Sequence, residues 1–510
     1  MKPHLPNKII DAQQAFIEGR RISNNVIVAQ EITHTFSLST WKHQAFMLKI
    51  DLAKAFDRIE WDFIFMALHK QGFSDHFINL VKACISNSNF SVIINGDYHG
   101  KFRGQRGIRQ GCPLSPYLFV TAINELAVEL QEDLQKKNIQ GVSLGPNCPP
   151  VYSLMFADDL LVCGQANKRE ALTILNTIDK FYKQSGQIPN WTKSSILFSK
   201  HVTEAQKNSI KQIFMVEEMG NHSMHLGHPL ILPAKNRSQA YEFILQKFKS
   251  KLTCYKANKL SHAARLVLIK SVLSSIPVYY MANILLSKKL LAKINAIIRD
   301  FWWIGIQQQN KTRPIYLKAW TEICKSKKEG GLGIRNIEAV NKALLLNAAW
   351  KIATTPDSNT TKILKAKYFS NTSFWRANPK IPKSAFWTSI LKVKDHLTDA
   401  TTYQFSRGNT SIWSDPWCPF SKDIHNHLNI QDNNFVYPAT VSDLWVPNLK
   451  IWNIPLLTTL FGTHKANEVA NIPISQDDRD DILIWKYTPA GICTSKSAYQ
   501  FFRSLLLWSK

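Results

Sequence analysis

Three aspartates lie next to apolar runs of the sequence. Carboxylates in such places cost folding free energy, so a chemical role is a reason for their presence. Asp51 ends the apolar run AFMLKID, and Asp158 and Asp159 separate two apolar runs in LMFADDLLVC. Apolar flanks predict a hairpin whose tip holds both later acids between buried strands. Adjacent carboxylates there repel each other and lose hydration, and a divalent cation relieves both costs. Two Mg²⁺ ions on such oxygen ligands could activate a 3′-hydroxyl and stabilise a leaving pyrophosphate in phosphoryl transfer.

An Asp-Asp pair taken alone is most often a solvated turn. Here apolar residues flank the pair on both sides, and Asp51 ends another predicted strand 107 positions before Asp158. Acids at the ends of two buried strands favour a shared site over two unrelated turns.

The pattern of apolar residues predicts the elements that must position these acids. Buried strands are expected at 45–51, around the acids at 151–163, and at 196–198. Helical periodicity covers four further ranges, 11–40, 57–85 with a break near Gly72, 113–134 and 168–184. Asn95-Gly96 between β-rich runs predicts a hairpin over 90–103. From about residue 355 onward the pattern weakens and predicts no particular fold.

Composition places the chain among globular proteins with an anionic partner. Its 510 residues suggest about three domains, and 45% hydrophobic residues against 20% charged ones allow a sizeable core. The net charge of +26 favours nucleic acid or an anionic membrane surface as partner. A basic segment of helical pattern spans 247–270 and is either a solvated helix face or a helix that follows a phosphate backbone. Its candidate nucleic-acid-binding residues are Lys249, Lys256, Lys259 and Arg265.

Metal-binding cysteines and a membrane span are both disfavoured. The eight cysteines form no CxxC pair, which argues against a zinc ribbon. The stretch 266–286 has nearly the length of a span, but Lys270 and Pro277 interrupt it. It predicts a buried helix pair broken at Pro277, and a membrane-associated role is only a third hypothesis. His222, His225 and His228 have a metal-like spacing, yet a turn is the better interpretation.

Four motifs occur in order, KIDLAKAFD, RQGCPLSPYLF, FADD and SGQIPNWTKSS. Together they resemble the palm motifs of reverse transcriptases, and most of all those of plant non-LTR (LINE-type) retrotransposons. The resemblance extends over nearly the whole chain through three further segments, QQAFIEGRRISNNVIVAQEI, HLGHPL and GGLGIRNIEAVNKALLLNAAW. It implies an α+β polymerase right hand, with partial fingers and the palm in 1–200, a helical thumb in 201–350 and a C-terminal region of uncertain fold in 351–510.

The resemblance also assigns roles to the acids and to one aromatic residue. Asp51 and Asp158 would hold two Mg²⁺ ions, with Mn²⁺ as an alternative, and Asp159 would contribute beside them. Phe56 lies at the steric-gate position, where a flat ring would clash with a 2′-hydroxyl and select dNTP over rNTP. Ordinary packing of an aromatic residue is the competing interpretation of Phe56.

Further roles concern the nucleotide and its phosphates. Gln110 and Gly111 would meet the incoming nucleotide and the template in a loop that opens a helix. Arg109, together with Arg106, would contact phosphates, and Lys193 would stabilise or protonate the pyrophosphate. Solvated surface charge is the competing interpretation for all three basic residues.

The implied function is that of an RNA-directed DNA polymerase, which transfers nucleotides from dNTP to a DNA primer on an RNA template. No membrane partner is expected. Nuclear localisation is expected from the family's way of life. The ends resemble those of a truncated element copy, and Cys112 and Pro189 replace residue types usual in relatives. Pro189 could distort the turn that carries Lys193. The alternative is therefore a catalytically inactive, nucleic-acid-binding remnant.

Overall fold

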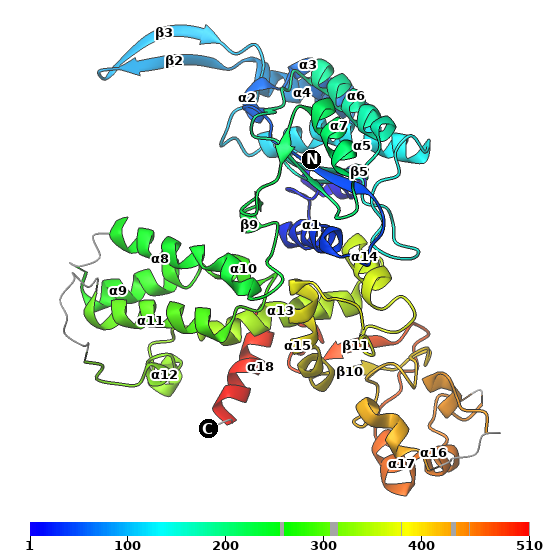
Figure 1. Ribbon diagram of the computed structural model, residues 1–510. Coiled ribbons are helices and arrows are strands. Elements are labelled where there is room, and N and C mark those ends of the chain that lie inside the picture. Colours follow the sequence, from blue (N-terminus) through cyan, green and yellow to red (C-terminus); the bar gives the residue numbers. More distant parts are fainter. Residues whose placement is uncertain (255–259, 306–314, 379, 430–434, 448, 509–510) are drawn as a thin grey trace. The chain divides into compact units, whose positions relative to one another are not determined.

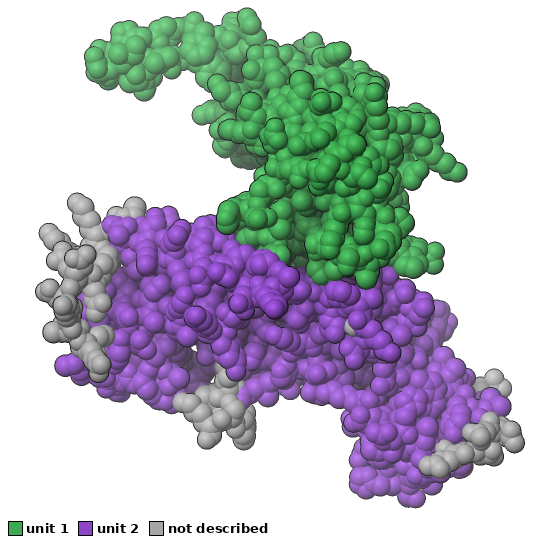
Figure 2. Space-filling view, in the orientation of Figure 1, with its two compact units in different colours: residues 1–232 green, residues 233–510 purple. Residues whose placement is uncertain are grey.

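The computed structural model describes residues 1–254, 260–305, 315–378, 380–429, 435–447 and 449–508. The chain divides into two compact units, residues 1–232 and 233–510, which Figure 2 shows in different colours. Residues 201–232 belong to the first unit, where the helix Glu204–Phe214 packs against the helix Lys168–Ser185 and the strand Glu217–Glu218 pairs with the strand Ser195–Phe198. The finer division predicted at residues 200 and 350 stays a prediction.

Unit 1 mixes helices and strands in an α+β arrangement (Figure 1). Its elements, in chain order, are η1 (Lys2–Asn7), α1 (Ile22–Ser37), β1 (Ala45–Ile50), α2 (Ala55–Arg58), α3 (Trp61–Lys70), α4 (Asp75–Ser86), β2 (Asn89–Ile94), β3 (Asp97–Arg103), α5 (Ser115–Gln135), β4 (Ser153–Phe156), β5 (Asp159–Gln165), α6 (Lys168–Ser185), β6 (Ser195–Phe198), α7 (Glu204–Phe214), β7 (Glu217–Glu218), β8 (Met224–His225) and β9 (His228–Pro229). The predicted α+β fold class is confirmed.

A five-stranded sheet in the order β4-β5-β1-β6-β7 organises unit 1. The strand β1 lies between β5 and β6 and is antiparallel to both. Its residues AFMLKI are almost all buried, as expected for a central strand covered on both faces. In the register, Ile50 stands opposite Leu160, and Phe156 stands opposite Asp159 across the β4–β5 hairpin.

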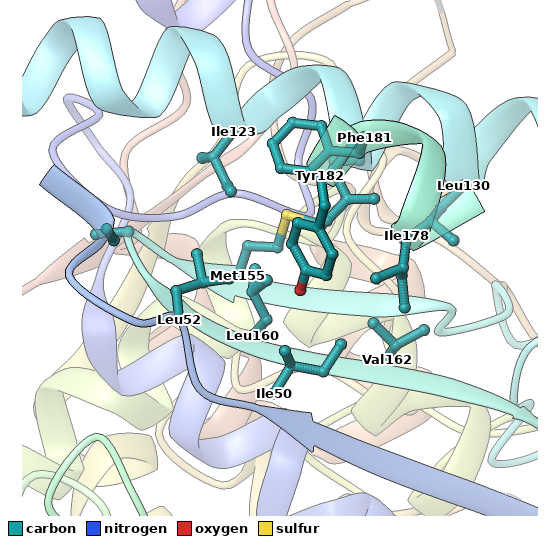
Figure 3. Close-up of a cluster of buried hydrophobic side chains, with 14 of the residues drawn as sticks. Ile50, Leu52, Ile123, Leu130, Met155, Leu160, Val162, Ile178, Phe181 and Tyr182 are labelled. Atoms are coloured by element: carbon teal, nitrogen blue, oxygen red, sulfur yellow. The ribbon is translucent and has the colours of Figure 1, made fainter. Parts of the chain in front are cut away.

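One face of this sheet packs against helices of unit 1 (Figure 3). Ile50, Leu160 and Val162 meet Leu130 of α5 and Phe181 of α6 within one hydrophobic core. All five side chains are at most 1% exposed. Burial of one such side chain stabilises a fold by about 1.5–3 kcal/mol, so this core fixes the strands against the helices.

The helix α1 contacts β4 and is tied to it by a buried side chain. Asn25 of α1 donates from Nδ2 to the carbonyl of Met155 at 3.1 Å. The predicted helix over 11–40 is correct only from Ile22, because Phe16 and Gly19 have positive φ angles of 58° and 82°. The preceding chain instead lies beside β4, with a bridge between Gln13 and Met155.

The hairpin predicted over 90–103 is confirmed as the β2–β3 ribbon. Asn95 and Gly96 form its turn with φ angles of 53° and 98°, the left-handed pair that a tight hairpin needs. Every residue of both strands is exposed. Figure 1 shows the ribbon projecting from the rest of unit 1.

Unit 2 is mainly helical. Its elements are η2 (Arg237–Tyr241), α8 (Phe243–Cys254), α9 (His262–Leu268), η4 (Ile269–Leu273), α10 (Val278–Met281), α11 (Lys288–Ile304), α12 (Trp320–Ile323), η5 (Lys327–Glu329), α13 (Ile337–Thr354), α14 (Asn359–Tyr368), α15 (Ala385–Ala400), β10 (Thr401–Gln404), η6 (Ser421–His427), η7 (Val441–Leu444), α16 (Ile454–Phe461), α17 (Thr463–Ala470), β11 (Ile482–Trp485) and α18 (Ser495–Trp508). The helix α13 packs against α10, α11, α15 and α18 and so forms the centre of this unit.

Two further features of unit 2 answer expectations from the sequence. The stretch 266–286 forms α9, η4 and α10 rather than one helix, and Pro277 precedes α10 as its N-cap. Among the described residues, no helix combines the length and the apolar character needed to cross a bilayer. A separate core gathers tryptophans between Phe405 and Val469, in the part where the sequence predicts no fold.

Candidate active site

The three aspartates meet at one end of the sheet because of the register between β1 and β5. Ile50 stands opposite Leu160 in this antiparallel pair. Asp51 and Asp159 are the next residues after this pair on the two chain segments, at the same end of the sheet. Asp158 is the preceding residue, at the tip of the β4–β5 hairpin. Two acidic segments far apart in the chain thus converge at one sheet end.

The hairpin tip holds an unusual backbone conformation. Ala157 has a φ angle of 54°, which costs a residue with a Cβ atom about 1–2 kcal/mol. Ala157 is buried, whereas Asp158 is exposed and Asp159 is half-buried. The turn therefore presents Asp158 to solvent while its apolar neighbours anchor the hairpin.

A buried glutamine supports this tip. The Oε1 atom of Gln13 accepts the backbone N–H of Ala157 at 3.2 Å and that of Ala15 at 2.8 Å. Gln13 is 0% exposed. Sequence reasoning missed this residue, because a buried glutamine carries no periodic or motif signal that separates it from a surface one. Only the pairing of its segment with β4 reveals its position.

The environment of Asp159 opposes its charged form. Burial raises the pKa of the Asp159 carboxyl, the charges of Asp158 and Asp51 raise it further, and Lys49 acts in the opposite direction. The charges of Asp158 and Asp51 thus both act on the Asp159 carboxyl. The Lys49 ammonium is itself held by the carbonyl of Met224 at 2.7 Å.

Hard carboxylate oxygens from two strands are the donor set that Mg²⁺ prefers, so the residues fit the expected metal. However, within the described part of the chain no three His, Cys, Asp or Glu side chains are gathered as a ready metal site. The assignment of Asp51, Asp158 and Asp159 as metal ligands stays a prediction.

The turn that carries Lys193 is fastened to the end of β1. The carbonyl of Asp51 accepts the N–H of Asn190 at 2.7 Å, and the N–H of Asp51 donates to Ser194 Oγ at 3.2 Å. Lys193 lies between these two contacts and is exposed. The structure thus brings this lysine to the same strand end as the acids.

Pro189 occupies a position in this turn where no backbone N–H is needed. Leu52 and Pro189 form an antiparallel bridge. The hydrogen bonds that flank the bridge use the carbonyl of Ile188 and the N–H of Asn190, at 3.0 and 2.7 Å. Because the N–H that proline lacks is not needed there, the substitution costs no hydrogen bond.

Phe56 lies half-buried at the start of α2, next to the helix α5. Its ring stacks on that of Phe119, with ring centres 4.7 Å apart and planes 14° apart. Its carbonyl accepts the N–H of Ile108 at 2.8 Å. Gly107 permits this close approach, because a Cβ atom there would lie 2.6 Å from the carbonyl oxygen of Asp57. The steric-gate role of Phe56 stays a prediction.

The loop before α5 leaves its predicted nucleotide-binding residues exposed. Arg109, Gln110 and Gly111 are all solvent-accessible, and Gly111 has a φ angle of 88° that favours glycine. Arg106 instead pairs with Glu60 at 3.4 Å, on the surface. The helix begins at Ser115, close to the predicted start.

The basic residues of the second unit differ in their surroundings. Lys249 is exposed on α8. Arg265 donates to the carbonyls of Leu260 and Trp302 at 3.1 and 3.3 Å and so links α9 to α11. Lys256 and Lys259 lie outside the described residues. Phosphate binding by these four residues stays a prediction.

The three histidines near β8 and β9 do not form a metal site. His225 is buried and its Nε2 bonds to Asn25 Oδ1 at 2.7 Å, which makes Nε2 the protonated nitrogen. Burial lowers the pKa of His225 to about 3, with smaller contributions from Lys49 and His228. His222 is exposed. His225 therefore joins the β8–β9 hairpin to α1 as a neutral side chain.

Comparison with known proteins shows which proteins the chain is similar to. A family model described as "Reverse transcriptase (RNA-dependent DNA polymerase)" matches residues 1–225. An uncharacterized mitochondrial protein of Arabidopsis thaliana is 31% identical over 145 residues, which are 28% of this chain and 92% of that protein. An uncharacterized 149 kDa protein of transposon TX1 from Xenopus laevis is 26% identical over 64% of this chain and 24% of its own length.

Longer relatives are matched only in part. The Pol polyprotein of the type-1 retrotransposable element R2 from Popillia japonica is 30% identical over 27% of this chain and 22% of its own length. The chain spans 44% of an Arabidopsis thaliana protein that carries the name of a ribonuclease H, at 27% identity over 53% of this chain. A telomerase structure from Candida albicans covers 56% of this chain and 53% of its own, at 13% identity and a TM-score of 0.31.

Proposed function

Because the chain belongs to the reverse transcriptase family, with relatives among non-LTR retrotransposon proteins, we propose that it is an RNA-directed DNA polymerase. It would transfer nucleotides from dNTP to the 3′-hydroxyl of a DNA primer paired with an RNA template. The sheet of unit 1 corresponds to the palm of a polymerase right hand. A nuclear site of action is part of the proposal by resemblance alone.

One observation carries the proposal. In the register of β1 and β5, Asp51 and Asp159 are the next residues after the Ile50–Leu160 pair, and Asp158 precedes Asp159 at the hairpin tip. Clustered carboxylates of this kind are destabilising, as the raised pKa of Asp159 indicates. Such a cost is common where charge is gathered for catalysis.

Asp51 and Asp158 would hold divalent cations, with Asp159 beside them. Bound there, the cations would supply Lewis-acid chemistry that lowers the pKa of the primer hydroxyl and neutralises triphosphate charge. Lys193 would add positive charge, or a proton, at the departing pyrophosphate. The turn that carries Lys193 is hydrogen-bonded to the backbone of Asp51. The backbone of Lys193 therefore keeps a constant distance from the acids.

The remaining predicted residues would select and orient the nucleotide. Phe56 would lie under the sugar, with its ring supported by Phe119. Gln110 and Gly111 would meet the base pair from the loop before α5, and Arg109 would approach a phosphate. All three loop residues are exposed and can be reached by a ligand.

A second candidate is an inactive remnant that still binds nucleic acid. It is favoured by one observation, that the described acids do not form a ready metal site. The two candidates differ in one property, which is incorporation of nucleotides.

Primer extension on poly(rA)/oligo(dT) with Mg²⁺ separates them. The Asp158→Ala variant should lose incorporation while it keeps its RNA affinity and its thermal midpoint. Asp97→Ala removes another exposed acid, on the β2–β3 ribbon, and should incorporate like the parent. RNA binding by the parent chain without any incorporation would favour the remnant.

A further inference from the structure

A cavity of about 990 Å³ lies within unit 2. Its walls come from the chain around η2, from residues 284–291 at the start of α11, and from α13 and α15. This volume is at the upper end of the range of pockets for organic ligands and exceeds what one inorganic ion needs. Nothing in the palm chemistry above uses it.

The lining of this cavity is strongly cationic. Six basic residues face it, together with the two acids Glu242 and Glu338. The basic residues are Arg237, Lys288, Lys289, Lys293, Lys342 and Lys392. Each acid is already engaged, Glu242 by Lys293 at 3.0 Å and Glu338 by Lys342 at 2.9 Å.

Four cations are therefore left over: Arg237, Lys288, Lys289 and Lys392. No acid in the described part of the chain forms an ion pair with any of them. Arg237 donates only to a hydroxyl, Thr388 Oγ1, at 3.3 Å. Uncompensated cations around one cavity repel each other, and an anionic occupant removes that repulsion.

The backbone adds to the same field. The helix α11 has 17 residues, begins at this cavity and has no acid in its first turn. Ser287 Oγ caps the N–H of Leu290 at 3.3 Å, and Asn341 and Ser238 accept the N–H groups of Leu286 and Ser287. The N–H groups of Lys288 and Lys289 follow, in the turn where a helix carries partial positive charge.

The position of the lysines favours a strand over a small enclosed ligand. Lys288, Lys289 and Lys392 are exposed, so these cations can be reached from solvent. Lysine ammonium groups at such an edge bind phosphates as point charges.

We propose that this cavity is a second nucleic-acid site, which binds phosphate groups of a single RNA strand. The choice of RNA rests on the proposed function, whereas the preference for phosphate rests on the cavity alone. A free polyphosphate offers the same chemistry and is the other source of such groups.

The test is binding of a labelled single-stranded RNA 20-mer to the full chain in EDTA, followed by fluorescence anisotropy. The variant Lys288→Ala/Lys289→Ala/Lys392→Ala should bind at least tenfold more weakly at 150 mM salt. Its salt dependence should be shallower by about 2 in the slope of log K against log salt, from about 0.7 for each lost phosphate contact.

The control variant Lys327→Ala/Lys328→Ala/Lys380→Ala removes the same charge from exposed lysines elsewhere in unit 2. It should change RNA affinity less than twofold. Equal losses in both triple variants would overturn the proposal, because binding would then follow total charge and not this cavity.

Tripolyphosphate separates the two sources of phosphate. It should compete with RNA for the parent chain. Tripolyphosphate could raise the thermal midpoint of the parent but not that of the variant Lys288→Ala/Lys289→Ala/Lys392→Ala. If the parent and this variant then bind RNA with equal affinity, the RNA assignment is wrong. If the parent chain does not extend a primer but its RNA binding still depends on the cavity lysines, the proposed activity is wrong and this inference holds.

Discussion

The backbone of Asp51 and the backbone of Asn190 are joined, with the Asp51 carbonyl accepting the Asn190 N–H at 2.7 Å. The second bond, from the Asp51 N–H to Ser194 Oγ at 3.2 Å, closes the turn on its other side. Lys193 is held between them although its side chain is exposed. The position of this lysine is thus set by the strand that carries the acid, and not by contacts of its own ammonium group.

The Lys193→Ala variant should therefore lose turnover without losing stability. We expect kcat for nucleotide incorporation to fall on the order of 10²-fold, the usual contribution of a group that assists a leaving group. The urea midpoint should not change, since the side chain is exposed. Lys200→Ala, another exposed lysine nearby in sequence, is the matched control. An unchanged kcat in Lys193→Ala would remove this residue from the mechanism.

Replacement of Phe56 by alanine should relax the choice of sugar. If its ring excludes the 2′-hydroxyl, Phe56→Ala should lower the preference for dNTP over rNTP on the order of 10²-fold. The measurement is kcat/KM for matched dNTP and rNTP. Phe119→Leu removes the stacking partner that supports the ring, so it should lower stability and shift sugar preference less than Phe56→Ala does. Equal sugar preference in parent and Phe56→Ala would leave ordinary packing as the role of this ring.

Gln13 should act on turnover through the hairpin tip. The Gln13→Ala variant leaves the N–H of Ala157 without its side-chain acceptor in a buried place, which costs about 1–3 kcal/mol of stability. A looser tip misplaces Asp158, so kcat should fall while KM for dNTP changes little. Steady-state extension and urea unfolding measure the two effects. In the neighbouring Gln14→Ala variant the backbone bond from the Gln14 N–H to Met155 remains and the lost Oε1 accepts no hydrogen bond, so this variant should keep its kcat.

His225 should make stability fall in weak acid. Its pKa is about 3 in the folded chain, against about 6.5 when unfolded, so the unfolded chain takes up the proton first. Its stabilisation is complete above pH 6.5 and is lost as the pH falls from there toward 3. Between pH 7 and pH 5 the expected loss is about 2 kcal/mol.

Urea unfolding at the two pH values isolates this contribution. The His225→Gln variant should lose less stability than the parent over this interval. His222→Gln, at an exposed position, should lose as much as the parent. Identical losses in all three proteins would mean that His225 does not hold its neutral form on folding.

Local elements around the acids could be predicted because their sequences are consistent. Apolar runs predicted β1 and the β4–β5 hairpin, and Asn95-Gly96 predicted the turn of the ribbon. The pairing of β1 with β5 could not be derived from periodicity, since every strand order shares the same period of two. The strand-end positions of the acids already favoured a shared site, but the antiparallel register that relates Asp51 to Asp159 came only from the structure.

Residues 11–21 show where local reasoning fails. Their apolar spacing suits a helix, yet Phe16 and Gly19 adopt left-handed φ angles and the segment lies beside β4. Long-range pairing outweighed a weak local preference there. Gln13 owes its place to this segment, so an error in one element concealed a residue that supports the site.

The β2–β3 ribbon carries Val92, Ile93 and Ile94 in the open, at 51%, 60% and 52% exposure. Among the described residues the sheet has only these two strands, so each keeps one outer row of amide groups available to a further strand. At high protein concentration, copies of the chain should therefore associate through hydrogen bonds between these outer amide groups. Added salt would do little to dissociate such aggregates. Backbone hydrogen bonds and hydrophobic contacts hold them together, rather than interactions between charges.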